Sequence, residues 1–157
     1  MITWLELQKQ WPDLAEAGRE QLYVHGLGLG FLATVRPDGG PRVHPVCPVI
    51  SPAGLHVFIQ PGPKLHDLRR DDRYSLHSET VPPPREDDGI ALTGRVREIT
   101  DQDVRAIAQR QFLSERGGVL WPGFDDHVMF ELHIERCLLT LTRPSDAFPS
   151  GPTVWKS

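Results

Sequence analysis

A tight hairpin followed by a short, lysine-led helix constrains the fold of this chain more than any other part of it. Residues 31–35 are apolar and β-branched, and Pro-Asp-Gly-Gly at 37–40 is typical of a turn. The chain resumes a strand-like pattern over 42–50, so the sequence predicts two antiparallel strands. After a third strand, residues 60–63 break the pattern and a short helix begins, with Lys64 in its first turn.

The start of this helix is a candidate anion site. The first N–H groups of a helix lack partners within the helix, and the positive end of its dipole favours an anion. Lys64 adds a full positive charge there, and Arg42 can supply a bidentate contact from the neighbouring strand. Local spacing alone leaves open the alternative that both are solubilising surface charges.

Residues 28–99 resemble the pyridoxamine 5'-phosphate oxidase-like family of FMN-binding split β-barrels. The motifs that carry the resemblance are Ala33-Thr34-Val35, Asp38-Gly39, the run from Pro41 to Val46, Lys64, the run from Asp67 to Asp71, Arg73 and Gly94-Arg95. The resemblance implies a mainly β (α+β) fold, an antiparallel split barrel of about six or seven strands with peripheral helices. Short strands separated by turns, with helices at the ends, favour the same architecture.

The resemblance also implies where a flavin would bind. It assigns the cofactor phosphate to Arg42 and Lys64, whereas Gly62 and Pro63 replace the Ser and Arg that the family places before the lysine. Backbone N–H groups are therefore expected to share the phosphate. By alignment alone, the ring is expected against Val43, Pro45 and Val46 on one strand and against Phe58 and Ile59 on another. His44 and His77 lie on strands that the resemblance places beside the ring, where either could hydrogen-bond the flavin or the substrate, and packing in the barrel wall is the alternative. Ser78 ends the strand of His77 where the ring would lie.

FMN is the first expected cofactor, with the deazaflavin coenzyme F-420 as the alternative. Arg69, Arg70 and Arg73 would tolerate the long anionic tail of the deazaflavin. The expected activity is oxidation or reduction of a small molecule, and the flavin itself would carry the redox chemistry. Members that oxidise pyridoxamine 5'-phosphate carry a C-terminal Arg-x-His-Asp-Arg-like element, which is not found between Gly151 and Ser157. A non-catalytic flavin-binding or haem-binding protein is the remaining alternative.

The family is dimeric, so the resemblance implies a homodimer with cofactors at the interface between the subunits. Trp121 and Trp155 are candidates for contacts supplied by the second subunit. Packing of Trp155 onto its own subunit is the alternative. Aromatic residues in a polar tail, such as Phe148 and Trp155, usually dock somewhere.

Composition limits the other functions of the chain. Its 157 residues predict one domain (1–157), with an N-terminal helical segment (1–26) and a C-terminal tail (144–157). A net charge of −4 without a basic stripe argues against nucleic acid, and no apolar run is long enough for a membrane span. With no secretion-type start, the expected location is the cytoplasm.

Metal and disulfide chemistry is not expected. The two cysteines, Cys47 and Cys137, are far apart in strand-like runs, so we expect both to be buried and reduced. The seven histidines show no His-x-x-x-His spacing, which predicts no metal site.

The remaining pattern places further elements along the chain. Thr3 with Glu6 forms a possible capping box, and Asp101 can cap a helix over about 102–115. Two runs, 128–134 and 138–142, predict a final hairpin.

Overall fold

The computed structural model describes residues 1–118, 122–144 and 146–157. Its helices and strands in chain order are α1 (Trp4–Gln10), α2 (Pro12–Leu22), β1 (Gly30–Val35), β2 (Pro41–Val46), β3 (Val49–Ser51), β4 (Gly54–Ile59), α3 (Pro63–Arg70), β5 (Arg73–Ser78), β6 (Gly89–Ile99), α4 (Gln102–Ser114), the short 3-10 helix η1 (Phe124–Asp126), β7 (Val128–Leu141) and β8 (Gly151–Lys156).

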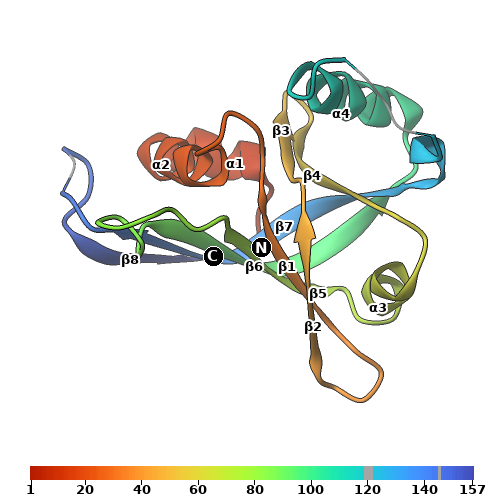
Figure 1. Ribbon diagram of the computed structural model, residues 1–157, viewed down its shortest axis with the longest axis horizontal. Helices are drawn as coiled ribbons and strands as arrows, with labels where there is room; N and C mark the ends of the chain where they lie inside the picture. Colours follow the sequence, from red (N-terminus) through yellow and green to blue (C-terminus); the bar gives the residue numbers. More distant parts are fainter. Residues whose placement is uncertain (119–121, 145) are drawn as a thin grey trace.

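The strands form one antiparallel sheet in the order β2-β1-β5-β6-β7-β4-β3, and β8 pairs with β7 off this path. The long strand β7 organises the sheet. Its first residues pair with β4, its last residues pair with β8, and β6 runs along its other edge (Figure 1). The predicted hairpin is confirmed, because Thr34 of β1 lies opposite Arg42 of β2.

The Gly94-Arg95 motif has a steric basis in this sheet. The β6–β7 register shifts between Thr93 and Gly94, as at a β-bulge. A Cβ atom at Gly94 would lie 2.0 Å from the carbonyl oxygen of His133. Only glycine therefore allows the two backbones to approach this closely.

Two faces of the sheet have different coverings. One face contributes Leu32, Leu76, Leu92 and Cys137 to the main core, which also receives buried side chains of α1, α2 and α3. At one end of the opposite face, α4 packs beside β3 (Figure 1) and helps to bury a second, smaller cluster. The rest of that face includes Val43 and Val154, which are 59% and 49% exposed.

The local predictions for the helices are confirmed. Thr3 and Glu6 form the expected capping box of α1, and Asp101 accepts hydrogen bonds from the backbone N–H groups of Asp103 and Val104 at the start of α4. No helix among the described residues is long and apolar enough to cross a membrane. Cys137 is buried as expected, whereas Cys47 is only half-buried, and both are free thiols.

The mainly antiparallel fold class is confirmed, but the C-terminal third differs in detail from the prediction. The described residues form eight strands, close to the six or seven that were expected. The expected final hairpin is one continuous strand, because β7 passes through Glu135 and Arg136 without a turn. Part of the expected tail forms β8, in which Trp155 lies opposite the buried Cys137 and turns toward the core side of the sheet.

Candidate functional site

The start of α3 has the properties of an anion site. Gly62 is the N-cap residue at φ 152°, a backbone conformation that favours glycine, and no side chain caps the helix there. Pro63 occupies the first helical position, so the first N–H groups that remain belong to Lys64 and its successor. The helix is therefore left with donors and positive dipole character at this end.

Lys64 is half-buried, and no carboxylate oxygen of the described residues lies within 4.0 Å of its ammonium group. Burial lowers the pKa of Lys64 below its ordinary value of 10.5. An ammonium group that is partly removed from water and lacks an anionic partner gains energy when an anion binds to it. These observations fit a phosphate at this position.

Lys64 opens onto a hollow of about 170 Å³ between β2, β4, α3 and the α4–η1 region. Four of its lining residues are predicted site residues: Pro45, Val46, Phe58 and Lys64. Five others were not predicted: Cys47, Gln60, Phe112, Phe124 and His127. Phe112 comes from α4, Phe124 comes from η1 and His127 follows η1, all far along the chain, and no local motif marks them as site residues.

One wall of the hollow is aromatic. The Phe58 ring meets Phe112 edge-on at 5.4 Å and Phe124 at 5.0 Å between ring centroids. His127 stacks on Phe124 at 5.1 Å, and its Nδ1 lies 3.2 Å from the Gly123 carbonyl oxygen. Such a wall suits a flat, apolar ring beside a charged group.

Arg42 reaches α3 but does not line this hollow. Its Nε donates to Oδ2 of Asp67 at 2.6 Å, and Asp67 lies three residues after Lys64 on α3. The same carboxylate accepts from Thr34 Oγ1 at 3.1 Å and from Arg70 Nη1 at 3.3 Å. Arg42 thus contacts the helix that carries Lys64, and among the described residues no hydrogen-bond acceptor pairs with the Nη groups of Arg42.

The other predicted residues on β2 and β5 divide between the two faces of the sheet. Pro45 lies opposite Phe31, which lies opposite His77, so these side chains share the face away from the main core. Val43 is on that face too, whereas Val46 is buried and His44 is exposed. His77 is exposed, and its Nδ1 lies 2.8 Å from the Ser78 carbonyl oxygen.

Three predicted site residues pack or hydrogen-bond within the fold itself. Ile59 is fully buried in the main core, and Ser78 Oγ accepts from the Ile90 N–H at 3.1 Å within the sheet. Trp155 packs edge-on against Trp11 of the same chain, at 5.0 Å between ring centroids. Trp121 lies outside the described residues.

The neighbouring arginines have carboxylate partners. Arg69 pairs with Glu98 at 2.9 Å, Arg73 pairs with Asp71 at 2.6 Å, and Arg70 contacts Asp67. Hydrogen bonding from Arg73 lowers the pKa of Asp71 to about 2, so this carboxylate stays ionised at neutral pH. Most of the positive charge near α3 is therefore neutralised locally.

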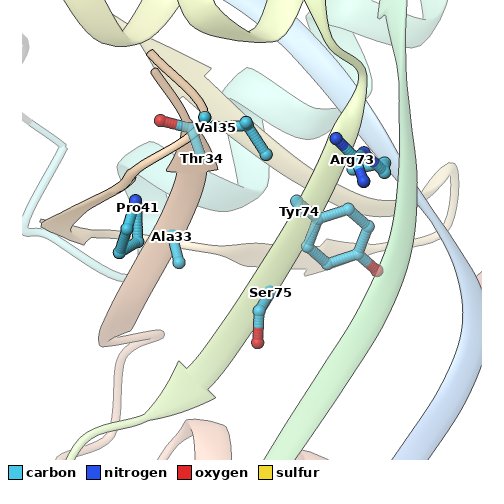
Figure 2. Close-up of a pocket in the computed structure, with 8 residues that line it drawn as sticks. Ala33, Thr34, Val35, Pro41, Arg73, Tyr74 and Ser75 are labelled. Carbon is cyan, nitrogen blue, oxygen red and sulfur yellow. The ribbon is translucent and has the colours of Figure 1, made fainter. Parts of the chain in front are cut away.

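A second hollow, of about 250 Å³, lies between the β1–β2 hairpin and β5 (Figure 2). Ala33 of β1, Pro41 of β2 and Ser75 of β5 line it, with Arg73 at one end. None of the residues predicted to hold the phosphate or the ring lines it, and Arg73, a candidate for the tail of the deazaflavin, already has a partner in Asp71. We therefore assign the candidate site to the Lys64 hollow.

The strand order and the helices around the sheet define a class of protein, the split β-barrel. Residues 17–141 match the model of the pyridoxamine 5'-phosphate oxidase family. The chain belongs to this family, as the resemblance of residues 28–99 predicted. A search of curated protein sequences found no significant match.

Several solved structures have a similar fold. An FAD-binding protein from Mesorhizobium loti is 28% identical, with a TM-score of 0.61 over 78% of this chain and 91% of that one. A heme binding protein from Mycobacterium smegmatis is 15% identical, with a TM-score of 0.66 over 89% of this chain but only 57% of that one. An F-420 reductase is 20% identical, with a TM-score of 0.58 over 75% and 94% of the two chains.

Proposed function

We propose that this protein binds FMN through its phosphate and oxidises or reduces a small molecule as a homodimer. The observation that carries the proposal is the half-buried Lys64, which has no carboxylate partner among the described residues and stands at the uncapped start of α3 beside an aromatic hollow. Membership of a family whose relatives include an FAD-binding protein supports a flavin.

The charge pattern favours FMN over the deazaflavin coenzyme. A deazaflavin with a long anionic tail needs several cations beyond the phosphate site. Arg69 and Arg73, which such a tail would use, each pair with a carboxylate of their own, whereas Arg70 and Arg42 share the single carboxylate of Asp67. Lys64, together with the Nη groups of Arg42, matches the charge of a single phosphate.

The residues of the hollow would bind and orient the cofactor. Lys64 and the first N–H groups of α3 would hold the phosphate. Phe58 and Pro45 would contact the apolar part of the cofactor and exclude water from it. A bound flavin supplies hydride and electron transfer, so the protein need not provide a nucleophile of its own.

The test is equilibrium titration of cofactor-stripped protein, by fluorescence and absorbance, with FMN, riboflavin, the deazaflavin coenzyme and haem. We expect FMN to bind more tightly than riboflavin, which has the same ring but no phosphate. Lys64→Ala should weaken FMN binding by about 1.5–3 kcal/mol, as expected for a charge-assisted hydrogen bond, and should leave riboflavin binding unchanged.

Lys9→Ala on α1 is the matched control, because Lys9 is exposed and lies outside the hollow. Preference for the deazaflavin would redirect the assignment to that coenzyme, and a Soret band with haem would favour haem binding. Binding of none of the four compounds would refute the cofactor proposal.

A further inference from the structure

A buried carboxylate sits next to the proposed phosphate site. The Asp67 side chain is 2% exposed and lies on α3, three residues after Lys64. Residues at this spacing are neighbours on a helix surface. A negative charge so close to an anion site opposes anion binding by electrostatic repulsion, so we expect a second role for this carboxylate.

The Asp67 carboxylate accepts hydrogen bonds from three side chains, one each on β1, β2 and α3. Oδ2 accepts from Arg42 Nε at 2.6 Å and from Thr34 Oγ1 at 3.1 Å, and Oδ1 accepts from Arg70 Nη1 at 3.3 Å. Burial alone would raise the pKa of Asp67, but these hydrogen bonds lower it below its ordinary value. The carboxylate is therefore ionised and fixed in place at neutral pH.

This arrangement restricts Arg42 more than it restricts Lys64. A guanidinium has a rigid fork, so a bond at Nε fixes the plane in which both Nη groups lie. The Lys64 ammonium is not within 4.0 Å of Asp67, so Asp67 does not neutralise it and it can interact with an anion in the hollow. The Arg42 side chain is 26% exposed, which leaves it accessible to a ligand.

We propose that Asp67 is a positioning residue, which holds the Arg42 guanidinium so that its Nη groups meet the phosphate of the cofactor. This inference rests on the proposed function and deepens it. Asp67 also offsets one positive charge, so the site fits one phosphate rather than a polyanion. The competing role is purely structural, in which Asp67 only fastens α3 to the hairpin.

The discriminating variant is Asp67→Asn, titrated with FMN and with riboflavin. Asparagine keeps the shape and one oxygen acceptor but removes the negative charge. Electrostatics alone predicts tighter FMN binding, because a like charge is lost. Positioning predicts the opposite, and we expect FMN binding to weaken by about tenfold while riboflavin binding changes by less than about twofold.

Repeating the Asp67→Asn substitution in an Arg42→Ala protein separates positioning from electrostatics further. In an Arg42→Ala protein there is no guanidinium to position, so adding Asp67→Asn should no longer weaken FMN binding. Glu98→Gln is the matched control. It removes a carboxylate that pairs with Arg69 of the same helix, at a position that is more exposed and outside the hollow.

Arg42→Lys keeps the positive charge but lacks the Nε fork, and it serves if Asp67→Asn does not fold. It should lower the preference for FMN over riboflavin by a similar factor. A wild-type protein without this preference would refute the phosphate site itself. A wild-type preference that Asp67→Asn leaves equal or strengthens, or that Arg42→Lys leaves intact, would overturn the role of Asp67 alone.

Discussion

At the scale of single residues, the charge state of Lys64 gives a pH-dependent prediction. Burial lowers the pKa of Lys64, so the ammonium loses its proton at a lower pH than an exposed lysine would. A bound phosphate favours the charged form, so FMN binding is strongest when Lys64 is protonated. The ratio of FMN to riboflavin affinity should therefore fall as pH rises, and the fall should begin below pH 10.5.

Titrations with both flavins from neutral pH to about pH 10 measure this ratio. Ionisation of the flavin ring affects both ligands alike, so its effect cancels in the ratio. Lys64→Arg is the control, because arginine stays protonated throughout this range. A ratio that is constant with pH in the wild-type protein would remove Lys64 from the phosphate site.

The places of Lys64 and Arg42 in their elements could be predicted because their signals are local, whereas their assignment to a phosphate comes from the family resemblance and stays a prediction. A lysine in the first turn of a helix and an arginine after a hairpin turn follow from turn and breaker residues a few positions away. The role of Asp67 depends on which strand packs against α3, and this is a property of the tertiary fold. For the same reason Phe124 and His127 could not be assigned to the site from the sequence.

At the scale of elements, a hydrogen-bond network holds α4, which supplies Phe112 to the hollow. The Tyr23 hydroxyl donates to Glu115 at 3.0 Å and accepts from the Ile50 N–H at 2.8 Å, which connects α2, β3 and the end of α4. Burial raises the pKa of Tyr23, so the hydroxyl keeps its proton. Tyr23→Phe should lower the free energy of unfolding by about 1–3 kcal/mol, because it leaves the Ile50 N–H without its partner and removes one of the hydrogen bonds of Glu115, which keeps those from Gln111 and Arg116.

Tyr74→Phe is a matched control for this change, measured by the same urea unfolding. The Tyr74 hydroxyl is also buried, but it has no hydrogen-bond partner among the described residues. Its removal should leave the stability unchanged or raise it. Equal losses for the two variants would contradict the role given to the Tyr23 network.

The elements that were predicted well have strong local boundaries, as the capped helices α1 and α4 show. The errors lie where the secondary structure of a segment depends on which strand it pairs with. Glu135 and Arg136 read as a break between two strands, yet pairing with β6 and β8 keeps β7 continuous past this point. The polar composition of the tail concealed β8, which forms because the edge of β7 is available to it.

At the scale of the whole molecule, the two faces of the sheet are not equally covered. Helices α1, α2 and α3 pack on the main core, whereas the opposite face carries Val43, Pro45 and Val154 as exposed apolar residues. Val43 and Pro45 lie on β2 and Val154 lies on β8, with β1, β5, β6 and β7 between them, so apolar surface is exposed at two places on this face. Exposed apolar surface favours association with a partner. A second copy of the chain, placed against this face, would cover the same strands that carry the predicted ring contacts.

Val43→Lys tests this arrangement, because it places a charge at an apolar position of β2 that is 59% exposed and lies on the proposed interface. Light scattering after size exclusion should give about twice the chain mass of 17.7 kDa for the wild-type protein and a monomer for the variant. Leu5→Lys on α1, at a position 39% exposed, is the control and should remain dimeric. A wild-type monomer that binds FMN with full affinity would contradict the dimer while leaving the phosphate site intact.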